Sequence, residues 1–233
     1  MGLTDRDYMQ PGGTTLRDRP RTYRPPVSRQ RGTWAVLGLV ALNVLLFLLQ
    51  VGSQGQAAAV TPAAAMQPAA VAEGEVWRLL TATFLHADPT HLLFNMLGLY
   101  FLGPPLAHAW GAGRFVTLYL VGGVLANVVL LLAGLVGFLP YTVWGLGASG
   151  SVLTVVGATA VLYPRLTVLV FGILPMTLST FALIYGGLFV FNLVQQGPNY
   201  GGDLCHLVGL ILGAGWAWLG PWSRPGAWEE ATW

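Results

Sequence analysis

The stretch GASGSVLTVVGATAVLY, residues 147–163, joins a group of small residues to an apolar run of helical length. A second apolar run, residues 204–220, carries His206 close to its own start. Runs of this length are typical of segments that cross a bilayer. If both enter the membrane from the same side, Ser149 and His206 lie at one depth, where a histidine can activate a serine nucleophile.

The composition is that of a polytopic membrane protein, because 55% of the residues are hydrophobic and only 9% are charged. Six apolar stretches approach the roughly 20 residues that cross a hydrocarbon core. They are residues 33–52, 91–109, 115–137, 146–163, 176–194 and 204–220. We predict an all-α bundle of six transmembrane helices. The short stretch 166–174 is expected to lead into the fifth span or to lie shallowly in the inner leaflet.

The positive charges predict the orientation, since all 11 basic residues are arginines and most of them precede the first span. With the N-terminus inside, six spans also place Arg114, Arg165 and Arg224 inside and leave only Arg78 outside. Both termini are therefore predicted to be cytoplasmic. The Arg- and Pro-rich tail, residues 1–32, is expected to be disordered, and residues 222–233 form a second cytoplasmic tail.

The first outer loop, residues 53–90, changes character along its length. Its first half is rich in Ala, Gln and Pro and is expected to be flexible, whereas the second half, EGEVWRLLTATFLHADPT, is expected to be ordered on the outer leaflet. Trp77 and the aliphatic stem of Arg78 suit the membrane interface. An apolar face is expected to enter the membrane there, formed by Leu79, Leu80, Phe84 and Leu85.

In this topology the second, fourth and sixth spans all begin at the outer surface, so residues early in each lie at one level. His91 and Asn95 are four residues apart and therefore share a helix face. Both can supply hydrogen-bond donors of the kind that stabilise an oxyanion. The alternative is that both side chains only bond to neighbouring helices.

Small residues surround the candidate nucleophile, and Gly147 and Gly150 have an alternative role in letting helices approach closely. Gly209 and Gly213 follow His206 on the same helix face. The fourth and sixth spans are thus predicted to pack backbone to backbone. This packing would bring the imidazole to the serine hydroxyl as a general base.

Other roles for His206 are a metal ligand or a packing histidine. The chain has no HExxH motif, and His86 and His91 are five residues apart rather than four, so a zinc protease site of that kind is disfavoured. Asp203, one turn before His206, either orients the imidazole or caps the helix N-terminus. Cys205 is interpreted as a buried small hydrophobe. No metal and no cofactor are predicted.

Together these elements resemble the rhomboid family of intramembrane serine proteases, with a six-span domain over residues 33–221. The matching elements are GASG with Ser149, HLLFN with His91 and Asn95, the Trp77-Arg78 pair, FLH ending at His86, and CHLVGLILG around His206. In one departure from the family, Leu153 stands where many bacterial members carry a tyrosine beneath the catalytic imidazole.

The resemblance implies a Ser149–His206 dyad that forms an acyl-enzyme, with His91, Asn95 and the Ser149 backbone N–H as the oxyanion hole. It implies transmembrane protein substrates cleaved near the outer face, a lipid bilayer as partner and no nucleic acid. The composition suggests a bacterial cytoplasmic membrane. Two rivals are an inactive relative that binds membrane clients, which usually lacks the serine or the histidine, and a solute channel or carrier, which would spread polar residues across the whole membrane depth.

Overall fold

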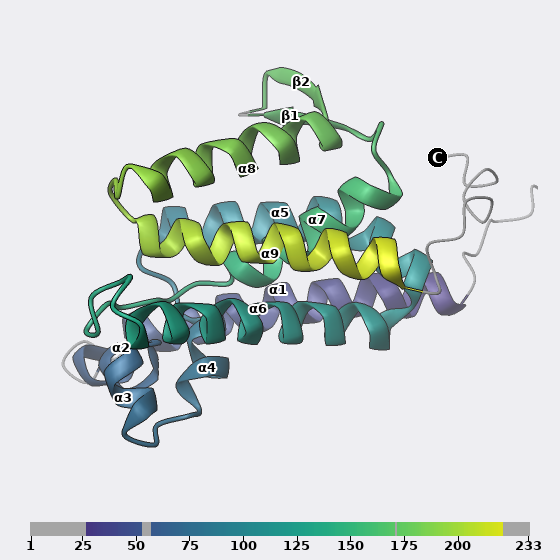
Figure 1. The fold of residues 1–233 in the computed structure, drawn as a ribbon. Coiled ribbons are helices and arrows are strands. Elements are labelled where there is room, and N and C mark those ends of the chain that lie inside the picture. The colour runs from purple at the N-terminus through teal and green to yellow at the C-terminus, as the bar shows by residue number, and fades with distance from the viewer. Residues whose placement is uncertain (1–26, 53–56, 171, 221–233) are drawn as a thin grey trace, which may run out of the picture.

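The computed structural model describes residues 27–52, 57–170 and 172–220. This part of the chain is mostly helical, with one short hairpin (Figure 1). The helices are α1 (Val27–Gly52), α2 (Ala57–Ala64), α3 (Pro68–Ala72), α4 (Arg78–Thr81), the 3-10 turn η3 (Ala82–Phe84), α5 (Pro89–Trp110), α6 (Ala112–Leu135), α7 (Ser149–Leu162), α8 (Leu178–Val194) and α9 (Tyr200–Leu219). The strands are β1 (Thr167–Val170) and β2 (Leu174–Thr177).

Four helices in the described part, α1, α5, α6 and α9, are long and apolar enough to cross a membrane. Two further apolar helices, α7 and α8, have 14 and 17 residues and are too short to count by the same length criterion. All six coincide with the predicted apolar stretches. The structure is therefore a bundle of apolar helices with four candidate spans, and the predicted count of six needs α7 and α8 to cross as well.

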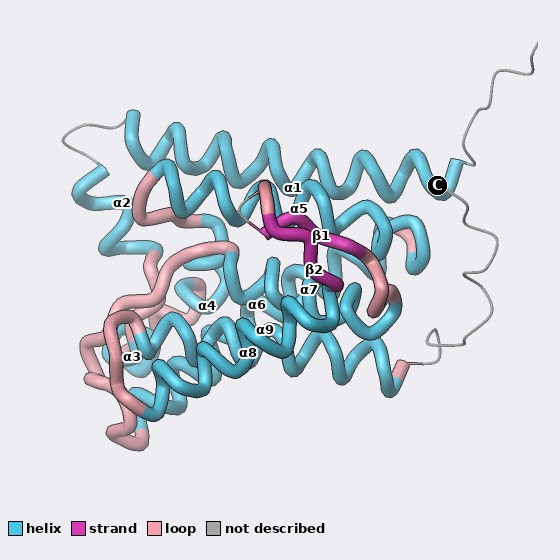
Figure 2. Tube along the Cα trace, turned by 90° about the horizontal axis from the view of Figure 1, so that it is seen from above, coloured by secondary structure: helices cyan, strands magenta, loops and turns pink. Residues whose placement is uncertain are grey.

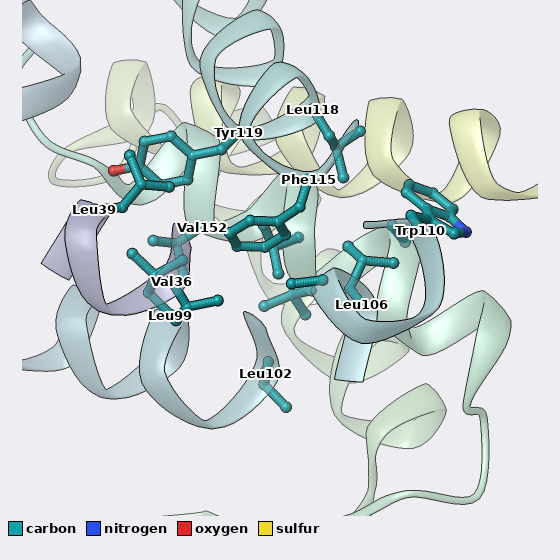
Figure 3. Packing of buried hydrophobic residues seen from close by; sticks show 14 of the residues in the cluster. Val36, Leu39, Leu99, Leu102, Leu106, Trp110, Phe115, Leu118, Tyr119 and Val152 are labelled. Atoms are coloured by element: carbon teal, nitrogen blue, oxygen red, sulfur yellow. The ribbon is translucent and has the colours of Figure 1, made fainter. Parts of the chain in front are cut away.

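The bundle is arranged around α7, which packs against α9, α6 and α5. Helix α1 lies beside α5, and α8 covers the outer side of α9 (Figures 1 and 2). The main core gathers buried side chains from α1, α5, α6 and α7 (Figure 3). They include Val36, Leu39, Leu99, Leu102, Leu106, Phe115, Leu118, Tyr119 and Val152. Because apolar faces point both inward and toward lipid, these helices show little amphipathic patterning.

The hairpin adds a strand pair that the sequence analysis did not predict, because β1 pairs antiparallel with β2, with Thr167 opposite Thr177. β2 ends directly before α8, which agrees with the expected lead into that stretch, and a shallow position in the inner leaflet stays a prediction. The sequence TVLV favours an extended backbone through its β-branched residues. Gly172 has φ +74° in the turn, a conformation that glycine adopts without steric cost. The fold is thus almost, but not entirely, α-helical.

The helix boundaries also differ from the sequence limits. Helix α1 begins at Val27, so residues 27–32 extend the helix rather than belonging to the predicted disordered tail. Polar residues can continue a helix beyond the hydrocarbon core, because the interface tolerates their side chains. Helix α5 begins at Pro89, and the Asp88 carboxylate caps it by accepting from the His91 N–H at 2.9 Å. Residues 1–26 of the predicted N-terminal tail and the whole predicted C-terminal tail, residues 222–233, lie outside the described residues.

The second half of the first loop is ordered around Arg78, as short helices at one end of the bundle (Figure 1). The guanidinium donates to the carbonyl oxygens of Pro62 and Ala65, the latter at 2.7 Å, and pairs with the Glu75 carboxylate at 2.6 Å. Only 6% of Arg78 is exposed. The prediction that its stem lies along the interface is wrong, because carbonyls at the end of α2 replace water as partners of the buried charge.

The apolar face predicted for this loop is likewise turned mostly inward. Leu85 is buried, while Leu79 and Phe84 pack against the two hydrophobic cores, which leaves Leu80 as the exposed member. Trp77 is about half exposed, as expected for the interface, and its indole N–H donates to the Ala63 carbonyl at 3.2 Å. The loop is therefore a set of short helices that pack against the bundle.

Candidate active site

Ser149 and His206 meet at the N-terminal ends of two adjacent helices. Ser149 is the first residue of α7, and His206 lies in the second turn of α9. The Nε2 atom of His206 is 2.8 Å from the Ser149 Oγ atom, which is hydrogen-bond distance. An imidazole in this position can accept the serine proton as the hydroxyl attacks an electrophile.

Close packing of α7 on α9 sets this distance. A Cβ atom on Gly209 would lie 2.5 Å from the Gly150 carbonyl oxygen, and one on Gly213 would lie 1.9 Å from the Thr154 carbonyl oxygen. The predicted backbone-to-backbone packing is therefore present. Sequence reasoning missed Gly157, where a Cβ would lie 2.2 Å from the Leu210 carbonyl oxygen. Its place two turns after Ser149, on the same face, was the available signal.

Gly147 shapes the backbone next to Ser149. Its φ is +131°, a backbone conformation that other residues rarely adopt. A Cβ atom here would also lie 2.6 Å from the His91 ring, so the imidazole of His91 sits directly against this glycine. On the far side, a Cβ on Gly150 would lie 2.9 Å from the Ala126 side chain of α6. At both glycines of the GASG stretch, a side chain would therefore clash with a neighbouring residue.

A cavity of about 380 Å³ opens at this point. Ser149, His206 and His91 line it, and α6 contributes Ala126 and Asn127. Because Ser149 begins α7, the first N–H groups of that helix have no acceptor within the helix. These free donors and the positive end of the helix dipole lie beside the cavity. The site therefore combines a serine hydroxyl and an imidazole at hydrogen-bond distance with a region that favours negative charge.

His91 and Asn95 are placed differently from each other. The Ala87 N–H donates to His91 Nδ1 at 3.4 Å, so the neutral ring carries its proton on Nε2, beside Gly147 and the cavity. The Asn95 amide nitrogen instead donates to the His91 carbonyl oxygen at 2.9 Å, and Asn95 is buried and does not line the cavity. The structure brings His91, but not Asn95, to the candidate oxyanion position.

His86 supports His91 from behind. Its fully buried ring lies between Phe47 and His91, at centroid distances of 6.4 and 5.3 Å. Burial lowers the pKa of His86 to about 4, and the neighbouring His91 adds to this effect. The Gln50 side chain bonds both backbone groups of His86, at 2.9 and 3.2 Å. Sequence reasoning missed Gln50, although a glutamine near the end of an apolar span is a signal for such a partner.

Asp203 lies on the side of His206 away from the serine. Its Oδ1 atom is 3.3 Å from His206 Nδ1. Two roles are predicted for Asp203. Capping of the helix is not observed, because the N-cap of α9 is Asn199. Cys205 is partly buried, and its thiol faces the Ala126 carbonyl at 3.6 Å, which agrees with the prediction of a small apolar residue.

Two residues of α8 that the sequence analysis did not single out also reach this region. The Phe189 ring lies 5.0 Å from the His206 ring between centroids, and the Asn192 amide donates to the Asp203 carboxylate. Both lie within the stretch predicted as the fifth span. An aromatic residue in an apolar helix gives no sequence signal of such a contact, whereas Asn192 was detectable as a polar residue in that span.

Comparison with known proteins gives the same family as the sequence motifs. The model of the rhomboid domain family matches residues 73–223, which leaves α1 outside the match. Rhomboid protease GluP of Bacillus subtilis (strain 168) is 35% identical over 121 residues, covering 51% of this chain and 22% of GluP. The putative rhomboid protease YdcA of the same organism is 43% identical over 58 residues, covering 25% of this chain and 29% of YdcA.

A plant relative extends the comparison. The mitochondrial RHOMBOID-like protein 12 of Arabidopsis thaliana is 29% identical over 157 residues, covering 62% of this chain and 46% of the relative. The chain spans less than half the length of each of these three proteins. The domain match, in contrast, takes in more than half of the chain and all four of α5, α6, α7 and α9. This multi-pass membrane protein therefore belongs to the rhomboid family.

Proposed function

We propose that the chain is an intramembrane serine endopeptidase that cleaves transmembrane segments of membrane proteins. The 2.8 Å contact between His206 Nε2 and Ser149 Oγ is the observation that carries the proposal. Nε2 accepts the serine proton while Oγ attacks the scissile carbonyl carbon. The imidazolium then protonates the leaving amine, which gives an acyl-enzyme on Ser149. His206 next deprotonates a water molecule that hydrolyses this ester.

The oxyanion of each tetrahedral intermediate is stabilised by donors at the start of α7. The backbone N–H of Ser149 is free of an intrahelical acceptor, and His91 presents an Nε2–H next to Gly147. Asn95 joins them when its amide turns from the His91 carbonyl toward the cavity. Removing one donor of an oxyanion hole in a comparable site costs about 10²- to 10³-fold in kcat.

The length of α7 supports cleavage below the outer surface. Its 14 residues span about 21 Å at 1.5 Å per residue, whereas the hydrocarbon core is about 30 Å thick. The helix ends just before Arg165, a residue suited to the cytoplasmic interface. With that end fixed there, Ser149 lies roughly 10 Å beneath the outer boundary. The cavity beside Ser149 then supplies the route by which water reaches this depth.

The proposed topology follows from the same arrangement. α7 and α8 complete six crossings, both termini face the cytoplasm, and the loop from α2 to η3 lies outside. The N-terminal ends of α5, α7 and α9, which carry His91, Ser149 and His206, then share the outer side. The abundance of arginine in the N-terminal tail supports this orientation in a bacterial cytoplasmic membrane.

The test compares the wild type with Ser149→Ala and His206→Ala in liposomes that contain a transmembrane reporter substrate. We expect both variants to lose cleavage and to lose labelling by a fluorophosphonate, a probe that reacts with activated serines. Ser151→Ala is the matched control, because its fully buried hydroxyl lies in the same helix and does not line the cavity. Cleavage that persists in Ser149→Ala would show the proposal to be wrong. Reporter bound intact by the wild type would favour a client-binding scaffold.

A further inference from the structure

The ring nitrogen of His206 that faces away from Ser149 has one close neighbour in the described part of the chain. Asp203 Oδ1 is 3.3 Å from Nδ1, which is ion-pair distance, and no group in the described residues forms a hydrogen bond with that buried nitrogen in its present orientation. A proton on Nδ1 leaves the lone pair on Nε2 to accept from Ser149. The carboxylate thus favours the tautomer that general-base catalysis needs.

Asp203 is itself held by the neighbouring helix. The Asn192 amide of α8 donates both to the second carboxylate oxygen of Asp203 and to the Pro198 carbonyl oxygen, the latter at 2.8 Å. The turn between α8 and α9 packs tightly against the Asn192 side chain, since a Cβ atom on Gly197 would lie 1.9 Å from the Asn192 amide oxygen. One oxygen of Asp203 is therefore fixed by α8 while the other faces His206.

The same helix supports one face of the imidazole. The Phe189 ring lies one turn before Asn192 and meets the His206 ring at a centroid distance of 5.0 Å and an interplanar angle of 53°. Leu153 of α7, by contrast, faces Gly209, where a glycine Cβ would lie 3.3 Å from its Cβ. The aromatic contact with the base thus comes from α8 and not from the nucleophile's helix.

We propose that Asn192, Asp203 and Phe189 are positioning residues that fix the tautomer and the plane of His206, so that α8 holds the base for the reaction. The inference rests on the proposed function of His206 as that base. In the transition state the imidazole becomes a cation, and the Asp203 carboxylate then forms an ion pair with it. None of the three positioning residues needs to contact the substrate.

The first experiment reads the tautomer directly and does not depend on proteolysis. The chain has only 4 histidines, so ¹⁵N-histidine labelling gives few NMR signals in detergent, and the His206→Ala spectrum assigns one of them. We expect the wild-type His206 to show the tautomer with the proton on Nδ1. Asp203→Ala is expected to give a mixture of tautomers, and Asn192→Ala an intermediate spectrum. Gln195→Ala, an exposed residue in the same helix end, is the control.

The second experiment measures kcat and KM on the transmembrane reporter. We expect Asp203→Ala to lower kcat by about tenfold or more with KM changed less than about threefold, because the residue acts on the base and not on substrate binding. Phe189→Leu is expected to lower kcat, and Phe189→Tyr, which keeps the ring, to restore it. Phe191→Leu, an exposed aromatic on the same helix, is the control.

The outcomes separate the two proposals. An unchanged tautomer and unchanged kcat in Asp203→Ala overturn the positioning role even if Ser149→Ala abolishes cleavage. If the wild type cleaves no reporter, the NMR measurement of the tautomer is the test. A His206 signal that is the same in the wild type and in Asp203→Ala then overturns the inference. A parallel loss of melting temperature and of kcat in Asp203→Ala, with an unchanged tautomer, assigns the residue to folding and also overturns it.

Discussion

Gly213→Ala tests whether the α7–α9 contact sets the geometry of the dyad. A Cβ atom at this position would lie 1.9 Å from the Thr154 carbonyl oxygen and 2.9 Å from the Ala158 nitrogen. Ordinary C···O contacts are about 3.3 Å or longer. The clash is with backbone atoms, which cannot rotate away as a flexible side chain can. The two helices must therefore separate by roughly 1 Å at this level.

The separation is transmitted to the dyad, because Gly213 lies two turns after His206 on the same helix. The 2.8 Å contact between His206 and Ser149 has little room to lengthen before it ceases to be a hydrogen bond. A misplacement of about 1 Å costs on the order of 10²-fold in rate, and overpacking costs about 1–3 kcal/mol of stability. We expect a ten- to hundredfold loss of kcat and a lower melting temperature.

The assay combines reporter cleavage in liposomes, fluorophosphonate labelling and thermal unfolding of the same preparations. The control is Gly215→Ala, because a Cβ atom at Gly215 meets nothing within 4 Å. Replacing a helical glycine by alanine stabilises a helix by about 1 kcal/mol, so this variant is expected to keep its activity with an equal or higher melting temperature. Wild-type kcat in Gly213→Ala would refute the argument that this packing positions the base.

Two further predictions concern Arg78 and His86 in the loop before α5. Arg78→Lys loses the planar fork that reaches the carbonyls of Pro62 and Ala65, and we expect about 2 kcal/mol less stability, measured by thermal unfolding, with faster proteolysis of the loop. His86 has its pKa lowered to about 4 from 6.5 by burial, so the unfolded state binds more protons between those values. The contribution of His86 to the free energy of unfolding is complete above pH 6.5 and falls by up to about 3 kcal/mol toward pH 4. In melting temperatures measured across this pH range, His86→Leu is expected to lack the His86 part of the decrease.

The sequence predicts the central pair of the site because that pair depends on local patterns. The small residues around Ser149 and the glycines after His206 repeat at helical spacing, so they mark facing surfaces before any tertiary structure is known. The burial of Arg78 is different. A lone arginine in an outer loop suggests an exposed charge, and only the carbonyl groups left free at the end of α2 show how its burial is compensated.

The hairpin between α7 and α8 escapes prediction for a related reason. Its strand residues, such as Val168 and Leu169, are as apolar as the helices α7 and α8 on either side. A short apolar run does not distinguish a strand from a buried helical segment by periodicity alone. What identifies these residues as a strand is the pairing of Thr167 with Thr177 across the turn, a contact that exists only in the folded chain.

The surroundings of His206 show why the residue at one position does not alone decide which contacts the imidazole makes. An imidazole has two faces and two nitrogens, so contacts with it can come from any helix that borders α9. Leu153 carries no ring to place against His206, and the helix on the other side, α8, supplies one through Phe189. A family motif describes which residue stands at each position of the chain. The orientation of the imidazole depends instead on the groups that contact it, whichever helix they come from. A ring on α8 is therefore placed to restrain His206 as a ring on α7 would, and this contact is visible only in the packed structure.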